Sequence, residues 1–365
     1  MPTDATRVIT NPGPEFADEV RRWQGIPGLE RAANGRLWAT WYSGGVTEDR
    51  HNYVLLATSA DDGATWSRAK LVIDPDGPGP VRAFDPCLWH DPLGRMWLFW
   101  NQKLCNREKE FTDEQERTWR LWAMRAEDSS REDTGWSQPE VIGEAIMMNK
   151  PTVLSTGEWM LCSSDWFWDR SARVFRSTDR GAHWEMWGSA HIPEKADRSF
   201  DEHMVVERRD GSLWMLIRTK YGIGESFSSD RGRTWSYVRP SAIAHVNSRF
   251  FIRRLRSGDL LLVKHGRTIA EKTEKRSHLS AFLSPDDGRT WEGGLMLDER
   301  LGVSYPDGVE APDGTIYLIH DFDRYGVKEI FLSRITADDI RAGRITSPKS
   351  ALCLLVNKAF GARGI

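Results

Sequence analysis

Short apolar stretches, each led by a turn glycine, recur along the whole chain. The residues after each glycine are aliphatic, β-branched or aromatic, which is typical of strands. Six copies begin at glycines spaced 47 to 63 residues apart: Gly35, Gly94, Gly157, Gly211, Gly258 and Gly314. A period of tens of residues is typical of repeat architectures, so we expect one structural unit per copy.

A second repeat follows the pattern S-x-D-x-G-x-x-W. Its copies occupy residues 59–66, 177–184, 228–235 and 284–291. The first gap of 118 residues (177 − 59) is about twice the later gaps of 51 (228 − 177) and 56 (284 − 228), which indicates one eroded copy, at residues 127–136. In such a turn Asp and Ser bond backbone N–H groups and Gly takes a positive φ, so we expect a structural role. A calcium loop is the competing interpretation, but its later acidic ligands are absent.

The two repeats together predict the architecture. Each unit contains a turn glycine, an apolar strand, a second strand such as residues 52–58, and the Asp-containing turn. Four short strands in about 50 residues form a propeller blade. The sequence therefore predicts an all-β protein in which residues 1–365 form a single six-bladed β-propeller domain with four-stranded antiparallel blades. We expect a strand at residues 6–10 to close the last blade, whose own strands run to about Val356.

Composition excludes several classes of protein. Hydrophobic residues make up 39% and charged residues 28% of the chain, a globular balance, and the net charge of -3 argues against nucleic-acid or anionic-lipid binding by bulk charge. Residues 1–16 lack an apolar signal region and no run of about 18 apolar residues occurs, so we expect a cytoplasmic protein without a membrane partner. The four cysteines lack C-x-x-C spacing, so neither disulfides nor a metal nor another cofactor is expected. Eleven of the 18 tryptophans belong to the repeats, which indicates that most of them are scaffold.

The Asp-containing turns, in a six-unit count, resemble those of the sialidase (neuraminidase) superfamily, and the similarity extends over nearly the whole chain. The resemblance implies a glycosidase for a sugar whose anomeric carbon carries a carboxylate. Such enzymes use a tyrosine nucleophile assisted by Glu, an exception to the usual pair of carboxylates. It also implies three arginines that bind the substrate carboxylate and an Asp that protonates the leaving oxygen.

Three segments match the family in order. Glu202, before the strand of the fourth unit, is similar to the residue that assists the nucleophile, and Arg218, at the end of the next strand, to a carboxylate-binding arginine. Arg276 resembles a second such arginine. Tyr305, in Gly302-Val-Ser-Tyr-Pro-Asp307, stands where the family carries its nucleophile.

The first unit departs from the family. Sialidases begin with Arg-Ile-Pro, whose arginine binds the carboxylate, but here the triplet is Gly25-Ile26-Pro27. Arg31 and Arg249 are candidates to replace that arginine, although neither stands at the family position. The acid/base position falls within residues 47–52, where Asp49 has the family's residue type and is preferred, and Glu48 fits a register shifted by one residue.

Further polar residues stand near the strand starts expected to face the central channel. A charge there suits either a ligand-lined funnel or a solvated loop. The candidates for substrate binding are Asp85, Lys150, Asp307 and Arg324. Trp89, Trp166 and Trp168 lie outside both repeats and are either sugar platforms or blade packing.

Three functions remain open on these residues. The first is a sialidase-like exo-glycosidase that removes a terminal acidic sugar from an oligosaccharide, with Tyr305, Glu202 and Asp49 in the chemistry. The second, motivated by Gly25, is a lyase or hydrolase for another acidic glycan, such as one with a uronate linked to rhamnose. The third is a propeller that binds glycans without turnover. The oligomeric state is not predicted.

Overall fold

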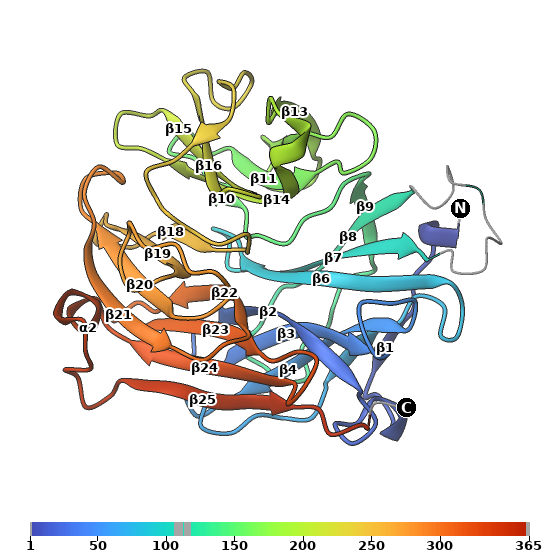
Figure 1. Cartoon of the computed structure of the whole chain (residues 1–365). Helices are drawn as coiled ribbons and strands as arrows, with labels where there is room; N and C mark the ends of the chain where they lie inside the picture. Colours follow the sequence, from blue (N-terminus) through green and yellow to red (C-terminus); the bar gives the residue numbers. More distant parts are fainter. Residues whose placement is uncertain (1, 106–111, 113–117, 363–365) are drawn as a thin grey trace.

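Six antiparallel sheets follow one another around a ring, and the chain runs once around it from blue to red (Figure 1). The computed structural model describes residues 2–105, 112 and 118–362. Five sheets have four strands in simple up-and-down order, and the first has a fifth strand at its edge. The predicted all-β, six-bladed propeller with antiparallel blades is therefore confirmed.

Each blade is built from consecutive strands, counted from the ring centre outward. Blade 1 contains β2 (Trp23–Arg31), β3 (Leu37–Gly44), β4 (Asn52–Ser59) and β5 (Leu71–Ile73); blade 2 contains β6 (Val81–His90), β7 (Met96–Leu104), β8 (Trp119–Ala126) and β9 (Glu140–Gly143); blade 3 contains β10 (Thr152–Val153), β11 (Trp159–Ser164), β12 (Ala172–Ser177) and β13 (Glu185–Ala190). Blade 4 contains β14 (Arg198–Glu207), β15 (Leu213–Thr219), β16 (Gly222–Ser228) and β17 (Arg239–Pro240); blade 5 contains β18 (Phe251–Arg254), β19 (Leu260–His265), β20 (Leu279–Ser284) and β21 (Glu292–Asp298); blade 6 contains β22 (Val303–Glu310), β23 (Ile316–Phe322), β24 (Glu329–Ile335) and β25 (Ala351–Lys358). The short helices are η1 (Pro2–Asp4), η2 (Pro14–Phe16), η3 (Lys195–Asp197) and α2 (Ala337–Ala342).

The two sequence repeats mark the two kinds of turn. The six glycines of the first repeat join the first and second strands of their blades, and all have a positive φ, from 81° to 98°. The Asp-containing turns join the third and fourth strands. In the first of them Ser59 Oγ donates to Asp61 at 2.8 Å, while Gly63 N–H donates to Ser59 Oγ at 3.0 Å. The eroded copy lies in blade 2, where Trp136 still pairs with Ala126. The structural role predicted for these turns follows from these bonds.

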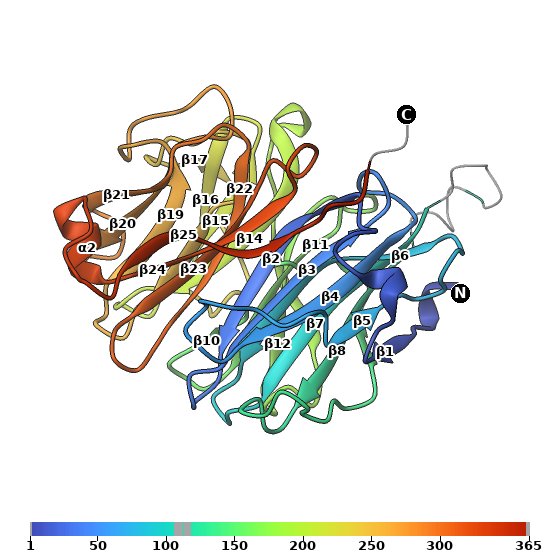
Figure 2. The same cartoon turned by 90° about the horizontal axis from the view of Figure 1, so that it is seen from below.

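The N-terminal strand does not close the last blade, so that prediction was wrong. Strand β1 (Val8–Thr10) pairs with β5 at the outer edge of blade 1, with Val8 opposite Ile73 (Figure 2). Blade 6 instead takes its outer strand, β25, from its own end of the chain. The ring closes through backbone bonds after β25, where Phe360 N–H donates to Asp18 O at 2.8 Å.

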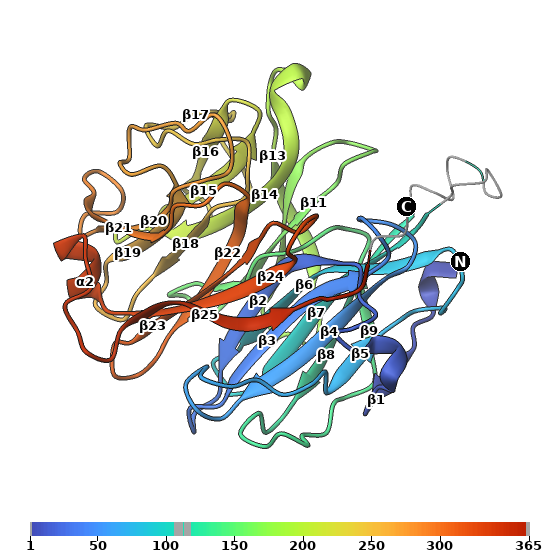
Figure 3. The same cartoon turned by 60° about the horizontal axis from the view of Figure 1, so that its bottom comes forward.

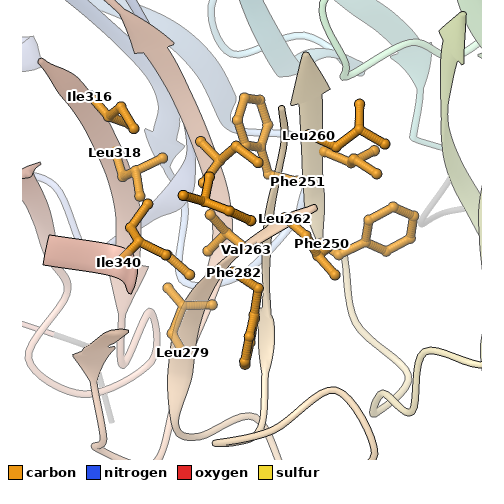
Figure 4. Packing of buried hydrophobic residues seen from close by; sticks show 14 of the residues in the cluster. Phe250, Phe251, Leu260, Leu262, Val263, Leu279, Phe282, Ile316, Leu318 and Ile340 are labelled. Atoms are coloured by element: carbon orange, nitrogen blue, oxygen red, sulfur yellow. The ribbon is translucent and has the colours of Figure 1, made fainter. Parts of the chain in front are cut away.

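The core lies between neighbouring blades, because each sheet is apolar on both faces. One buried cluster, for example, contains Leu260 and Leu262 of β19, Leu318 of β23 and Ile340 of α2, and it extends over blades 4 to 6 (Figure 4). Strands buried on both faces read as continuous apolar runs, which is why β3 and β7 show no alternation of polar and apolar residues. Stacked aliphatic and aromatic faces fix the blades to each other and hold their innermost strands at the centre (Figure 3).

No helix among the described residues is both long enough and apolar enough to cross a membrane.

Candidate active site

One residue of each blade lies at the same level around the ring centre. In every blade, the last residue of the innermost strand pairs with the residue that lies two positions after the turn glycine. In blade 6, for example, Glu310 pairs with Ile316. Counting back five residues from that last residue reaches one equivalent residue per blade, here called the central positions: Ile26, Asp85, Met148, Glu202, Arg249 and Tyr305.

Four central positions have a strained backbone. Ile26, Asp85, Glu202 and Tyr305 have φ values of 58°, 47°, 44° and 54°, which L-residues with bulky side chains rarely adopt. Each coincides with a register shift between the first and second strands of its blade. Such bulges turn a side chain out of the normal alternation, and they cluster at functional sites. The bulges therefore direct side chains from several blades toward the ring axis.

Tyr305, Glu202 and Arg218 form a hydrogen-bonded triangle. The Tyr305 hydroxyl donates to Glu202 Oε1 at 3.1 Å, and Arg218 Nη1 donates to the same oxygen at 2.6 Å and to the hydroxyl at 3.3 Å. All three residues are buried, at 3% to 6% exposure. Glu202 Oε2 is also buried but has no hydrogen-bond partner among the described residues. The sequence-predicted nucleophile, its assisting Glu and one arginine are thus in direct contact.

Arg218 is held in one orientation. Strand β15 presents it opposite Asp201, and its Nε donates to Asn247 Oδ1 at 2.7 Å, while the guanidinium lies 4.9 Å from the centre of the Phe200 ring. Burial alone would lower the pKa of Arg218, but Glu202 and Tyr305 raise it above its usual value. The remaining nitrogen, Nη2, has no hydrogen-bond partner in the described part of the chain. Asn247 was not predicted, although it stands only two residues before the central position of blade 5.

Two more arginines lie against the Tyr305 ring. The guanidinium carbons of Arg276 and Arg324 lie 5.3 Å and 4.9 Å from its centre. Burial raises the pKa of Tyr305 to about 12 and the charge of Glu202 adds to the effect, while Arg218, Arg276 and Arg324 oppose it. Arg276 is half-buried, and its guanidinium has no hydrogen bond or ion pair within the described ranges. Tyr305 is therefore a protonated phenol surrounded by three guanidinium groups.

Asp85 and Glu48 are the carboxyl groups on the other side of the centre. Asp85 is 4% exposed, and burial raises its pKa to about 8, with the negative charge of Glu48 adding to the effect and Arg82 opposing it. Glu48 is partly exposed and accepts from Arg324 Nη1 at 3.0 Å. Asp85 therefore holds a proton at neutral pH, whereas Glu48 is paired with a cation.

The preference for Asp49 over Glu48 is not supported by these contacts. Asp49 is buried, and its carboxylate accepts from the backbone N–H groups of Val46 at 3.1 Å and His51 at 2.9 Å. A short carboxylate that bonds the backbone of its own turn is typical of Asp in loops. The longer Glu48 side chain contacts Arg324 instead, so Glu48 rather than Asp49 reaches a residue beside Tyr305, while the acid/base role of either residue stays a prediction.

Four of the predicted substrate-binding residues lie away from the triangle. Arg31 is five residues beyond the central position, and its guanidinium lies 5.8 Å from the Tyr317 ring centre, at the far end of β2. Arg249 is 1% exposed and donates to Asn149 Oδ1 at 2.7 Å. Lys150 and Asp307 lie deeper in the channel. Arg31 therefore does not replace the missing arginine, and the other three are engaged within the protein.

Lys150 is the centre of a buried charge cluster that links four blades. Its ammonium donates to Glu30 Oε1 and to Leu88 O, both at 2.8 Å, and to Leu29 O, and it lies 3.4 Å from Asp307 Oδ2. Asp307 Oδ2 in turn accepts from Leu29 N–H at 2.8 Å. Burial would raise the pKa of Glu30, but Lys150 lowers it below its usual value. Lys150 and Asp307 therefore help to close the ring, and their contact with substrate stays a prediction.

Another polar group lies at the outer side of blades 5 and 6. Asp298, His320 and Cys353 form the one set of His, Cys, Asp or Glu groups in the described part of the chain that is close enough to share a metal. Arg300 donates to both oxygens of Asp298, with Nη2 at 2.5 Å from Oδ2. The carboxylate is therefore already neutralised by a guanidinium.

The tryptophans outside the repeats divide into two kinds. Trp89 is 1% exposed and packs on Trp159 with ring centres 5.0 Å apart, so it belongs to the scaffold. Trp166 packs on Phe200 at 5.2 Å, next to Arg218, and Trp168 is 59% exposed. Trp166 therefore lies near the triangle, and Trp168 presents aromatic surface to solvent.

One family model and several solved structures are similar to this chain. The model of the BNR repeat-like domain matches residues 35–318. The chain belongs to this family. Its fold is similar to that of the intramolecular trans-sialidase from Ruminococcus gnavus, with 15% identity, a TM-score of 0.70 and coverage of 93% of this chain and 99% of that one. It is also similar to the NanB sialidase from Streptococcus pneumoniae (15% identity, TM-score 0.67, 92% and 71% coverage).

This BNR-repeat propeller therefore shares its fold with sialidases. A protein of unknown function from Dyadobacter fermentans has a similar fold as well, with 16% identity, a TM-score of 0.65 and coverage of 88% of this chain and 96% of that one. At these identities the likeness concerns the fold alone. A search of curated protein sequences finds no match.

Proposed function

We propose that this BNR-repeat propeller is an exo-acting glycosidase that removes a terminal acidic sugar from an oligosaccharide. The observation that carries the proposal is the hydrogen-bonded triangle of Tyr305, Glu202 and Arg218 at the ring centre. A nucleophile in contact with a base that a third group orients is the general arrangement of covalent catalysis.

Tyr305 attacks the anomeric carbon. As its oxygen forms the new bond, the hydroxyl proton passes to Glu202, whose Oε1 is 3.1 Å away, and the bond from the anomeric carbon to the leaving oxygen breaks. The pKa of about 12 means that the free phenol keeps its proton until a base removes it during attack. A neutral phenol suits a sugar with a carboxylate on the anomeric carbon, because a carboxylate nucleophile would be repelled by it.

Asp85 supplies the proton for the leaving oxygen. Its pKa of about 8 leaves it protonated at neutral pH, and the charge of Glu48 favours that state. After the leaving group has gone, water attacks the anomeric carbon and the Asp85 carboxylate takes one of its protons. The bond between the sugar and Tyr305 breaks, and Glu202 returns its proton to the Tyr305 oxygen. Both steps occur on the same anomeric carbon, so the product keeps the configuration of the substrate.

Two guanidinium groups are free to bind the acidic group of the sugar. Arg218 Nη2 and the Arg276 guanidinium have no hydrogen-bond partner among the residues that the structure describes, and both lie beside Tyr305. Planar guanidinium groups bind carboxylates by paired hydrogen bonds. The substrate class is therefore an anionic sugar at a chain end.

Tyr305→Phe tests the proposal. We expect release of 4-methylumbelliferone from its α-glycosides of N-acetylneuraminic acid or glucuronic acid by the wild type, and loss of that release in the variant, with sugar binding retained. Arg31→Ala is the matched control because Arg31 lies at the far end of β2, and it should keep full activity. Full activity of Tyr305→Phe would refute the assignment, and binding without turnover by the wild type would identify a glycan-binding propeller.

A lyase for uronate-containing glycans is the second candidate, and the observation that favours it is Gly25 at the position of the family's first arginine. Elimination leaves an unsaturated uronate that absorbs in the ultraviolet, whereas hydrolysis does not. An absorbance trace on a glucuronate-containing oligosaccharide therefore separates the two chemistries.

A further inference from the structure

Gly25 leaves a space that the side chain of Arg324 fills. A Cβ atom on Gly25 would lie 2.2 Å from Arg324 Cδ and 2.6 Å from its Cγ, closer than any real contact. The φ of Gly25 lies outside the left-handed region, so its backbone conformation does not itself require glycine. The absence of a side chain is therefore tied to the presence of Arg324.

The surroundings hold Arg324 in this place. Asp321 Oδ2 accepts from Ile26 N–H at 2.8 Å and lies 3.7 Å from Arg324 Nε, so one carboxylate fixes both the backbone after Gly25 and the arginine. The turn that carries Arg324 is ordered by Asp323, whose carboxylate accepts from Gly326 N–H at 2.9 Å. The Arg324 side chain is only 10% exposed.

The guanidinium of Arg324 completes a set of three around Tyr305. It lies 4.9 Å from the ring centre, on the same ring that Arg276 contacts, while Arg218 bonds the hydroxyl. Its partner at the open side is Glu48, whose side chain is 36% exposed, at 3.0 Å. A ligand carboxylate can replace an exposed carboxylate partner at little cost, because Glu48 regains full hydration when it is released.

We infer that Arg324 supplies, from blade 6, the arginine that the first blade lacks, and that Arg218, Arg276 and Arg324 together bind the carboxylate of the sugar. Gly25 is a specificity-determining position because any side chain there displaces Arg324. The inference rests on the proposed function in one respect, that the ligand is an acidic sugar. It adds a binding residue that comes from a different blade than in the family pattern.

The experiment moves the arginine from position 324 to position 25 and measures ligand binding. The variants are Arg324→Ala, Gly25→Arg and the double variant Gly25→Arg/Arg324→Ala, each in the Tyr305→Phe protein so that no turnover intervenes. The probes are N-acetylneuraminic acid and glucuronic acid, with their uncharged methyl esters as controls, titrated by calorimetry. Arg324→Ala should weaken binding of a free acid by about 10- to 100-fold, the loss of one or two charge-assisted hydrogen bonds, and leave the ester unchanged.

The double variant should recover at least part of the lost affinity, because its new arginine projects from blade 1 into the space that Arg324 vacates. Gly25→Arg alone should lower the melting temperature, and Arg324→Ala should relieve that loss. Equal binding of the acid by the Tyr305→Phe protein and its Arg324→Ala variant would overturn the inference, and so would an equal loss for acid and ester or a Tyr305→Phe protein that does not prefer the acid. Preference for the acid through Arg324, together with no turnover by the wild type, would refute the proposed function only.

Discussion

Removal of Arg218 should show how much this residue contributes to the stability of the folded protein by compensating the buried charge of Glu202. Glu202 is 4% exposed, and Arg218 Nη1 lies 2.6 Å from its Oε1. Breaking a buried pair by removing one partner costs about 3–5 kcal/mol, because the remaining charge is left without compensation. A chain of 365 residues has an unfolding entropy of about 0.77 kcal/mol/K at about 2.1 cal/mol/K per residue. The melting temperature of Arg218→Gln should therefore fall by about 4–7 °C.

Calorimetric melts at pH 7 measure this loss, with Arg131→Gln as the control. Arg131 also donates to a carboxylate, Asp133, but that pair is exposed on the surface and contributes little to stability. The double variant Glu202→Gln/Arg218→Gln should recover most of the stability, because neither buried charge remains.

The outcome that contradicts this reasoning is a melting temperature for Arg218→Gln no lower than that of Arg131→Gln. A double variant as unstable as the single variant would show that packing, rather than charge, accounts for the loss. Both results would also remove the physical basis for Glu202 as an oriented, ionised base beside Tyr305.

Three further predictions concern Asp85, Glu48 and the turn glycines. Asp85→Asn should raise the melting temperature at pH 8.5 but not at pH 4. Burial raises the pKa of Asp85 to about 8, so the cost of ionising this carboxyl in the folded protein is absent below its unfolded pKa of ~4 and grows until the pH passes 8. Equal shifts of the melting temperature at both pH values would contradict this. Glu48→Gln should move the alkaline limb of kcat/KM to lower pH, since loss of the negative charge lowers the pKa of Asp85; an unmoved limb would exclude Asp85 as the proton donor. Gly314→Ala should cost about 1–2 kcal/mol of unfolding free energy for its φ of 84° alone. Gly288→Ala, with the same φ, should cost at least about 1 kcal/mol more, because its Cβ would lie 2.5 Å from the Trp214 ring; equal losses in chemical denaturation would show that the ring moves freely.

The architecture could be predicted because its turns are encoded locally. A glycine with positive φ, and a Ser and an Asp that bond the same turn, are chemical requirements of a few adjacent residues. The turn glycine recurs in every blade, and the Ser/Asp turn is intact in four of the six. The partner of the strand at residues 6–10 could not be predicted in this way. Its apolar pattern fits the open edge of any sheet. The pairing of β1 with β5 depends on where the edge of each blade lies in the folded chain.

The candidate site was predictable to the extent that it depends on position within a blade. Tyr305 and Glu202 stand at equivalent points of blades 6 and 4, so a ring brings them together whatever the loops do. The choice between Glu48 and Asp49 depends instead on side-chain direction within one loop. The shorter side chain bonds its own turn and the longer one reaches Arg324, and neither fact is visible in the order of residues.

Charge at the ring centre separates into two levels with different roles. Lys150 and Asp307 lie two residues past the central positions. Both bond strand β2 of blade 1 and lie 3.4 Å from each other, so their charges are compensated within the protein. At the level of Tyr305, Glu202 Oε2 lacks a partner and the Arg276 guanidinium has no counter-ion in the described part of the molecule, although such groups are costly to leave unpaired. The sequence alone does not separate the two levels, because both carry charged residues and they lie only two residues apart along each strand. Asp307 Oδ1 at the ring-closing level also lacks a hydrogen bond, but Arg249 Nη2 lies 3.7 Å from it. The Arg276 guanidinium without a counter-ion therefore distinguishes the level that binds a ligand from the level that closes the ring.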